Sequence, residues 1–176
     1  MTVAAALSDR LLRMVDALPL RPGMRVLEIG GAPGTAAREV AARVSPDGHV
    51  LVLDRSAAGV RRTRANCATE VAARNGPDGH VLVLDRSAAG IGRTRTYCAA
   101  EFTAGLLSTL RAPVEDFELD DGTAPFDLAF ACRVGALDGR HPSLYEPALA
   151  CLRRAVVPGG VLYVDTGSPL TAVSLR

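Results

Sequence analysis

The residues of this chain that could do chemistry begin with one short stretch near the N-terminus. Val26–Gly34 reads Val-Leu-Glu-Ile-Gly-Gly-Ala-Pro-Gly, an apolar strand that contains the acidic Glu28 and runs into a glycine-rich turn. Glycine lets the backbone turn and approach a ligand without a Cβ clash. Such a turn before a helix brings backbone N–H groups and the helix N-terminus close to a bound group. The stretch therefore predicts a site for a nucleotide-like ligand.

A second acidic residue follows the next apolar strand. Val50–Leu53 is a run of four apolar residues, and Asp54 and Arg55 come directly after it. The carboxylate of Asp54 offers two oxygens, which match two vicinal hydroxyl groups of a ligand. The other interpretation is that Asp54 caps the helix that follows.

Two more groups of polar residues lie in the C-terminal half. Glu115 belongs to an acidic loop at 115–122, and the loop 132–141 follows an apolar strand at 126–131. His141 is the best candidate for a general base, although a histidine in this setting is more often a surface loop residue. Cys132 is a weaker candidate for a nucleophile, because no paired Cys or His motif accompanies it.

The elements that must position these residues alternate between strands and helices. Strands are expected at about 25–29, 50–53, 107–111, 126–131 and 161–164, and helices at about 7–18, from 35 onward, and at 147–156. Strands that are apolar on both faces and alternate with helices indicate a parallel sheet covered on both sides. We predict one domain over residues 1–176, a three-layer α/β/α Rossmann-like sandwich with a mainly parallel sheet.

The chain also repeats itself. Residues 39–69 align with residues 70–100 with 24 identities in 31 positions, which indicates a tandem duplication of one strand-and-helix unit. If both copies fold, the sheet gains one parallel strand beside the second, and the third moves outward by about 4.8 Å. The alternatives are that one copy loops out or that two chains exchange units.

These motifs resemble those of class I S-adenosylmethionine-dependent methyltransferases over about residues 21–166. The glycine stretch is similar to the family's acidic-x-G-x-G-x-G motif, with Ala32 in place of the middle glycine. Phe126-Asp127-Leu128 and the later Pro158-Gly159-Gly160 resemble the fourth strand and the turn before the fifth. The resemblance implies S-adenosylmethionine as cofactor and methyl transfer as activity. It implies a cofactor site that includes Glu28, Gly30, Gly31, Ala32, Gly34, Asp54, Arg55, Asp85, Glu115 and Cys132.

The adenine end of that site is less clear than its methionine end. The family often places an acidic residue after the third strand, where this chain has Pro113, so Glu115 or Asp116 would have to substitute. If the repeat adds a strand, adenine would instead meet the loop that begins at Asp85.

Two other functions stay open. A dinucleotide-binding G-x-G-x-x-G fingerprint would need glycine at 30, 32 and 35, and the chain has Gly, Ala and Thr there. The other alternative is a non-catalytic remnant that binds cofactor weakly or acts as a scaffold. The family usually ends in two antiparallel strands, for which residues 171–176 leave too little room. An exposed edge would then need the C-terminal tail or a second chain, as in a homodimer, to cover it.

Composition excludes several classes of function. All 20 basic residues are Arg and the net charge is +1, so neither a P-loop lysine nor a general nucleic-acid-binding surface is expected. The four cysteines form no C-x-x-C pair, so no metal site is predicted. Without a signal sequence or an apolar run of spanning length, we expect a cytoplasmic protein whose acceptor is a small molecule rather than a nucleic acid or membrane.

Overall fold

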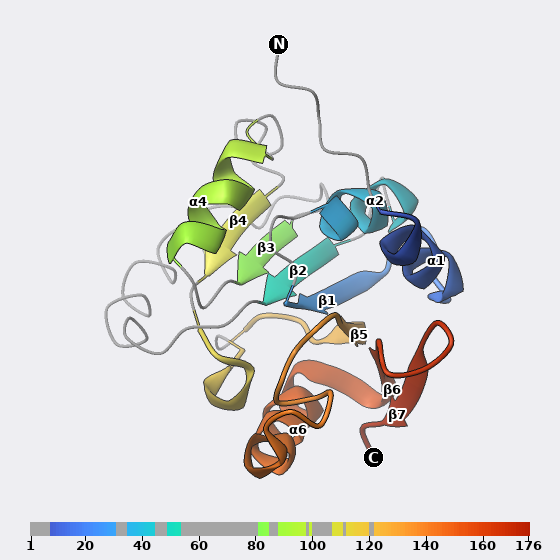
Figure 1. The fold of residues 1–176 in the computed structure, drawn as a ribbon, viewed down its shortest axis with the longest axis vertical. Coiled ribbons are helices and arrows are strands. Elements are labelled where there is room, and N and C mark those ends of the chain that lie inside the picture. The colour runs from blue at the N-terminus through green and yellow to red at the C-terminus, as the bar shows by residue number, and fades with distance from the viewer. Residues whose placement is uncertain are drawn as a thin grey trace.

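The fold is built on a single sheet. The computed structural model describes residues 8–30, 35–44, 49–53, 81–84, 88–97, 99, 107–110, 112–119 and 122–176. Within these residues, seven strands lie in the order β4-β3-β2-β1-β5-β6-β7 (Figure 1). Their bounds are β1 Arg25–Ile29, β2 His49–Leu53, β3 Val81–Leu84, β4 Leu107–Leu110, β5 Phe126–Ala131, β6 Val156–Val164 and β7 Thr171–Ser174. Neighbouring strands pair in parallel, except for the antiparallel pair β6 and β7.

Helices cover both faces of the sheet around β1, β5 and β6 (Figure 1). The described helices are α1 Asp9–Ala17, α2 Thr35–Val44, α4 Ala88–Tyr97 and α6 Tyr145–Ala155, with 3-10 turns η1 Val114–Asp116 and η2 Pro142–Leu144. Val26 of β1 packs with α1 and α2, whereas Leu27 and Ile29 belong to the cluster that contains α6. A strand apolar on both faces thus binds helices on both faces, and the predicted Rossmann-like α/β fold is confirmed.

The 31-residue repeat contributes two adjacent strands. β2 comes from the first copy and β3 from the second, and they pair in parallel with Val50 opposite Val81. β3 also pairs in parallel with β4, so it separates β4 from β2. The prediction of an extra strand beside the second is confirmed.

The C-terminal part differs from the sequence-based prediction in two ways. β6 begins at Val156 rather than at 161, because Pro158–Gly160 form a bulge between the pairs Phe126–Val156 and Leu128–Val161. The expectation that 171–176 is too short for a hairpin was wrong. Thr171–Ser174 form β7, which pairs antiparallel with the end of β6 and covers its edge. Four residues suffice, since β6 is already held in the sheet by β5.

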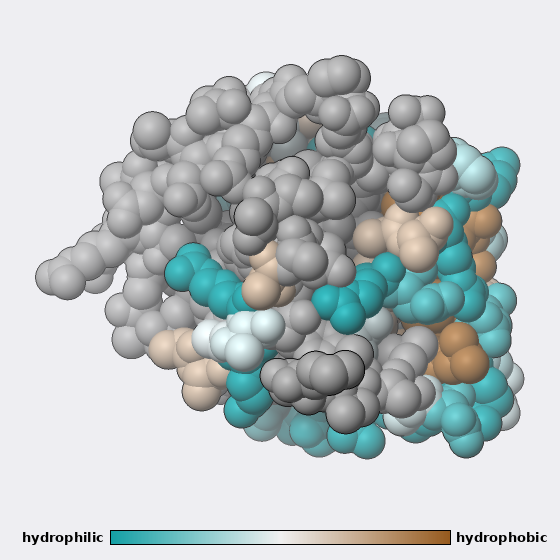
Figure 2. Space-filling view, turned by 90° about the horizontal axis from the view of Figure 1, so that it is seen from above, coloured by the Kyte–Doolittle hydropathy of each residue, from teal (hydrophilic) through white to brown (hydrophobic). Residues whose placement is uncertain are grey.

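None of the described helices combines the length and apolar character needed to cross a membrane. In the view of Figure 2, apolar residues form small separate patches among polar ones. Among the described residues, Leu12 of α1 is the large hydrophobic side chain that stands out, at 39% exposed.

Candidate functional site

The candidate site lies at the carboxyl edge of the sheet, where β1, β5 and β6 end side by side. Parallel strands bring their carboxyl ends to one edge, which is where ligands bind in open α/β sheets. The Cys132 N–H donates to the Ile29 carbonyl at 3.1 Å, and the Asp165 N–H donates to the Ala131 carbonyl at 3.2 Å. Backbone hydrogen bonds thus join the residue after β5 to the last residue of β1, and the residue after β6 to the last residue of β5.

Gly30, the residue after β1, is closely packed at this edge. Its φ is +82°, a left-handed conformation that glycine adopts without a steric penalty. A Cβ atom at this position would lie 2.5 Å from the Cys132 carbonyl oxygen and 2.7 Å from Val134 Cγ2. The first glycine of the turn is therefore required both for its backbone conformation and for close packing against the loop after β5.

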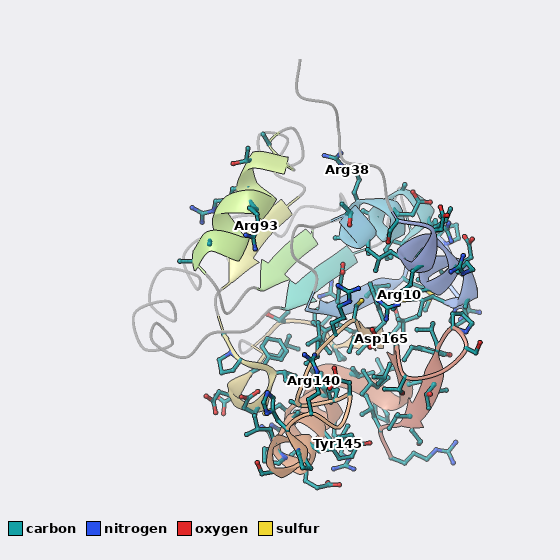
Figure 3. The ribbon with its side chains drawn as sticks, viewed as in Figure 1. Arg10, Arg38, Arg93, Arg140, Tyr145 and Asp165 are labelled. Atoms are coloured by element: carbon teal, nitrogen blue, oxygen red, sulfur yellow. The ribbon has the colours of Figure 1, made fainter. Side chains whose placement is uncertain are left out.

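Asp165, the residue after β6, contacts residues of α1 and of the turn after β5. Its side chain is 6% exposed and forms an ion pair with Arg10 of α1. The same oxygen, Oδ2, accepts a hydrogen bond from the Arg133 N–H at 3.1 Å and lies 3.6 Å from the Cys132 thiol. Figure 3 shows Arg10 and Asp165 together between α1 and the end of β6. One carboxylate thus connects α1, β6 and the turn after β5.

The thiol of Cys132 is held in its neutral form. Its pKa is raised to about 11, chiefly by burial and also by Asp165 and the charge of Glu28, while the charge of Arg10 opposes the shift. The thiolate, not the thiol, is the reactive nucleophile. The structure therefore argues against Cys132 as a nucleophile near neutral pH.

The loop after β5 is fixed by a second arginine. Arg140 donates from Nε and Nη2 to the Asp138 carboxylate and, at 2.6 Å, from Nη2 to the Arg133 carbonyl. These hydrogen bonds hold the pKa of Asp138 below its ordinary value. Arg133 itself has φ of +55°, uncommon for a residue other than glycine. The loop is therefore a defined structure at the mouth of the site.

The other predicted site residues lie in different settings. Glu28 is 1% exposed within β1. Glu115 lies in η1, and its carbonyl accepts a hydrogen bond from Cys151 of α6, so it belongs to the α6 side of the sheet rather than to the Gly30 edge. His141 is exposed, and its backbone N–H donates to Gly135. The remaining candidates, Gly31, Ala32, Gly34, Asp54, Arg55 and Asp85, lie outside the described residues.

Solved structures share this architecture. The YcgJ protein of Bacillus subtilis matches 88% of the chain with a TM-score of 0.54 and 14% identity, and the match spans 49% of that protein. TrmN of Thermus thermophilus matches 88% with a TM-score of 0.52 and 24% identity, over 35% of its length. An S-adenosylmethionine-dependent methyltransferase of Thiobacillus denitrificans, solved with S-adenosyl-L-homocysteine, matches 90% with a TM-score of 0.51 and 17% identity, over 48% of its length. The chain has the methyltransferase fold.

A sequence relative points the same way over a shorter stretch. The chain is 45% identical over 53 residues to the protein-L-isoaspartate O-methyltransferase of Methanothrix thermoacetophila, a match that spans 30% of this chain and 25% of that protein. No protein-family model matches the chain. The match covers a quarter of the length of this relative and less than half of the length of each of the three solved structures.

Two residues of the site were not among the predicted ones. Asp165 follows an apolar strand just as Asp54 does, so the rule that selected Asp54 could have selected it. No sequence pattern pointed to Arg10, because its partner Asp165 is 155 positions away in the sequence. Their contact depends on the position of α1, whose first turn lies at the carboxyl edge of the methyltransferase fold.

Proposed function

We propose that this protein binds S-adenosylmethionine and transfers its methyl group to a small-molecule acceptor. The observation that carries the proposal is the Gly30 turn, which has left-handed backbone and no room for a Cβ atom, at the edge where β1 and β5 end. The shared methyltransferase fold supports the cofactor, and the relative of 45% identity, named as an O-methyltransferase, supports the reaction.

The residues at this edge fit the proposed cofactor. Gly30 follows β1 directly and α2 begins at Thr35, and the backbone N–H groups at the start of that helix are proposed to face the methionine end. Glu28 supplies a buried carboxyl group two residues before Gly30, which is proposed to accept hydrogen bonds from the cofactor's ammonium group. Asp54, next after β2, is proposed to hold the ribose hydroxyls through its two oxygens.

The chemistry asks little of the protein beyond alignment. Bound S-adenosylmethionine supplies an activated methyl group, so the chain must position the acceptor and exclude water. The loop 132–141 is the proposed acceptor side, because Arg140 and Asp165 fix it next to Gly30. His141 is the proposed base for an acceptor that must lose a proton, and its exposed position leaves it accessible.

Calorimetric titration with S-adenosylhomocysteine tests the proposal directly. We expect saturable binding with a 1:1 stoichiometry, and S-adenosylmethionine should compete. Binding of NAD in place of S-adenosylhomocysteine, or no binding at millimolar ligand, would contradict the proposal. Binding without turnover of S-adenosylmethionine across a panel of small-molecule acceptors would instead favour the non-catalytic alternative.

A further inference from the structure

Asp165 connects more of the site than an ordinary ion pair requires. Its Oδ2 atom accepts from the Arg10 guanidinium, lies 3.1 Å from the Arg133 N–H and lies 3.6 Å from the Cys132 Sγ. Arg10 also reaches the Cys132 Sγ, at 3.9 Å from Nη1. The four residues come from the start of α1, the turn after β5 and the end of β6, and they meet at the edge that Gly30 shares.

The same carboxylate holds an unfavourable backbone conformation. Arg133 has φ of +55°, and left-handed conformations cost non-glycine residues about 1–2 kcal/mol. Its N–H is bonded to Asp165 and its carbonyl accepts from Arg140, so side chains fix both sides of the residue. Strained residues persist where their surroundings over-determine them, and such places are often functional.

We infer that Asp165 and Arg10 are a positioning pair, which sets the backbone and the electrostatic environment of Cys132 and Arg133 on the proposed acceptor side of the site. This role rests on the proposed function and goes beyond it, because it gives a part to two residues outside the glycine stretch. Asp165 holds the turn after β5 through the Arg133 N–H. The Cys132 carbonyl of that turn packs against Gly30, so the pair also influences the Gly30 side of the proposed cofactor site.

The reactivity of the Cys132 thiol can be used to test the pair of Asp165 and Arg10. The charged groups that act on its thiol are Arg10 from α1, Glu28 from β1 and Asp165 from β6, and burial has the largest effect. Asp165 raises the pKa of the thiol and Arg10 lowers it. Removing the two partners one at a time must therefore change the thiolate population in opposite directions if the pair acts as described.

The first experiment measures the alkylation rate of Cys132 by iodoacetamide at about pH 8.5, quantified by mass spectrometry of the tryptic peptide that ends at Arg133. D165N should react at least about threefold faster than the wild type, and R10A should react more slowly. If both variants react faster, the edge has merely loosened and the inference is overturned. Equal rates in all three proteins also overturn it. Because Arg10 is 42% exposed, R10A should fold even if D165N does not.

The second experiment measures affinity for S-adenosylhomocysteine by calorimetry. D165N should bind at least about tenfold more weakly than the wild type. The matched control is D16N, which removes the 2.6 Å ion pair between α1 and Arg43 of α2, away from the edge, and should bind within about twofold of the wild type. Unchanged affinity in D165N would overturn the inference. If the wild type does not bind, the proposed function fails, while the alkylation contrast still decides whether the pair exists.

Discussion

The carbonyl oxygen of Cys132 occupies the space that a Cβ atom on Gly30 would need, at a separation of 2.5 Å. Gly30→Ala must therefore either displace the turn after β5 or change the Gly30 backbone. Thermal or urea unfolding should show a loss of stability above the roughly 1–2 kcal/mol that a left-handed alanine costs by itself. Affinity for S-adenosylhomocysteine should fall as well.

Gly23→Ala is the matched control for this variant. Gly23 has nearly the same φ, +83°, but nothing lies within 4 Å of its would-be Cβ atom. It should show the backbone cost alone and keep its ligand affinity. Equal losses in the two variants would mean that the contact with Cys132 has no consequence.

The adjacent strands β2 and β3 allow the ribose assignment to be tested within one protein. β2 pairs with β1, while β3 lies one strand further out, by about 4.8 Å. Asp54 follows β2 and Asp85 follows β3 in identical local sequences. Asp54→Asn should weaken S-adenosylhomocysteine binding by about 1.5–3 kcal/mol, typical for a hydrogen bond to a charged group. Asp85→Asn should have a smaller effect, and the reverse order would move the ribose to the second copy.

Removal of the second copy should leave a working fold. Deleting residues 70–100 takes out β3 and α4 and brings β4 next to β2. β2 has the same Val-Leu-Val-Leu sequence as β3, so β4 finds an equivalent partner. We expect an unchanged strand and helix signature by circular dichroism and retained ligand binding. A chain that no longer unfolds cooperatively would show that the second copy is part of the core.

Acid should weaken the loop after β5 through Asp138. Hydrogen bonds from Arg140 lower the pKa of Asp138 below its ordinary value of 3.8. A lowered folded-state pKa gives stability that is present above the ordinary value and is lost as pH falls through the folded value. The melting temperature of the wild type should therefore drop more between about pH 6 and pH 3 than that of Asp138→Asn. The melting temperature of Arg140→Ala should show the same reduced dependence on pH. If the melting temperatures of both variants fall with pH as steeply as that of the wild type, Asp138 does not cause the acid sensitivity.

Most of the helices and strands, and the edge at which they meet, were predictable from the sequence. The alternation of apolar strands with helices predicted the sheet, and the intact strand pattern of both repeat copies predicted β3 between β2 and β4. These features depend on local sequence, which is why they could be read from it. The bulge at Pro158–Gly160 and the hairpin of β6 with β7 could not, because both depend on which residues of β5 and β6 pair.

The candidate site was predictable to a smaller extent. Gly30 and Cys132 were found from their positions after apolar strands, and the structure brings them into contact. Glu115 was chosen from the same kind of position, yet its contact is with Cys151 of α6. The Arg10 and Asp165 pair links the first described helix to the last parallel strand, and no spacing in the sequence encodes such a contact.

The repeat also has a consequence for how the chain reaches its native sheet. β2 and β3 carry the same four apolar residues, and the native state places β2 rather than β3 against β1. A refolding chain can form either pairing with nearly the same local contacts, so only the placement of the outer strands distinguishes them. Some folding molecules would then pair β1 with β2, as in the native sheet, and others would pair β1 with β3. The second group would have to separate these two strands before it could reach the native sheet. The same unit that widens the sheet therefore introduces kinetic competition into its assembly.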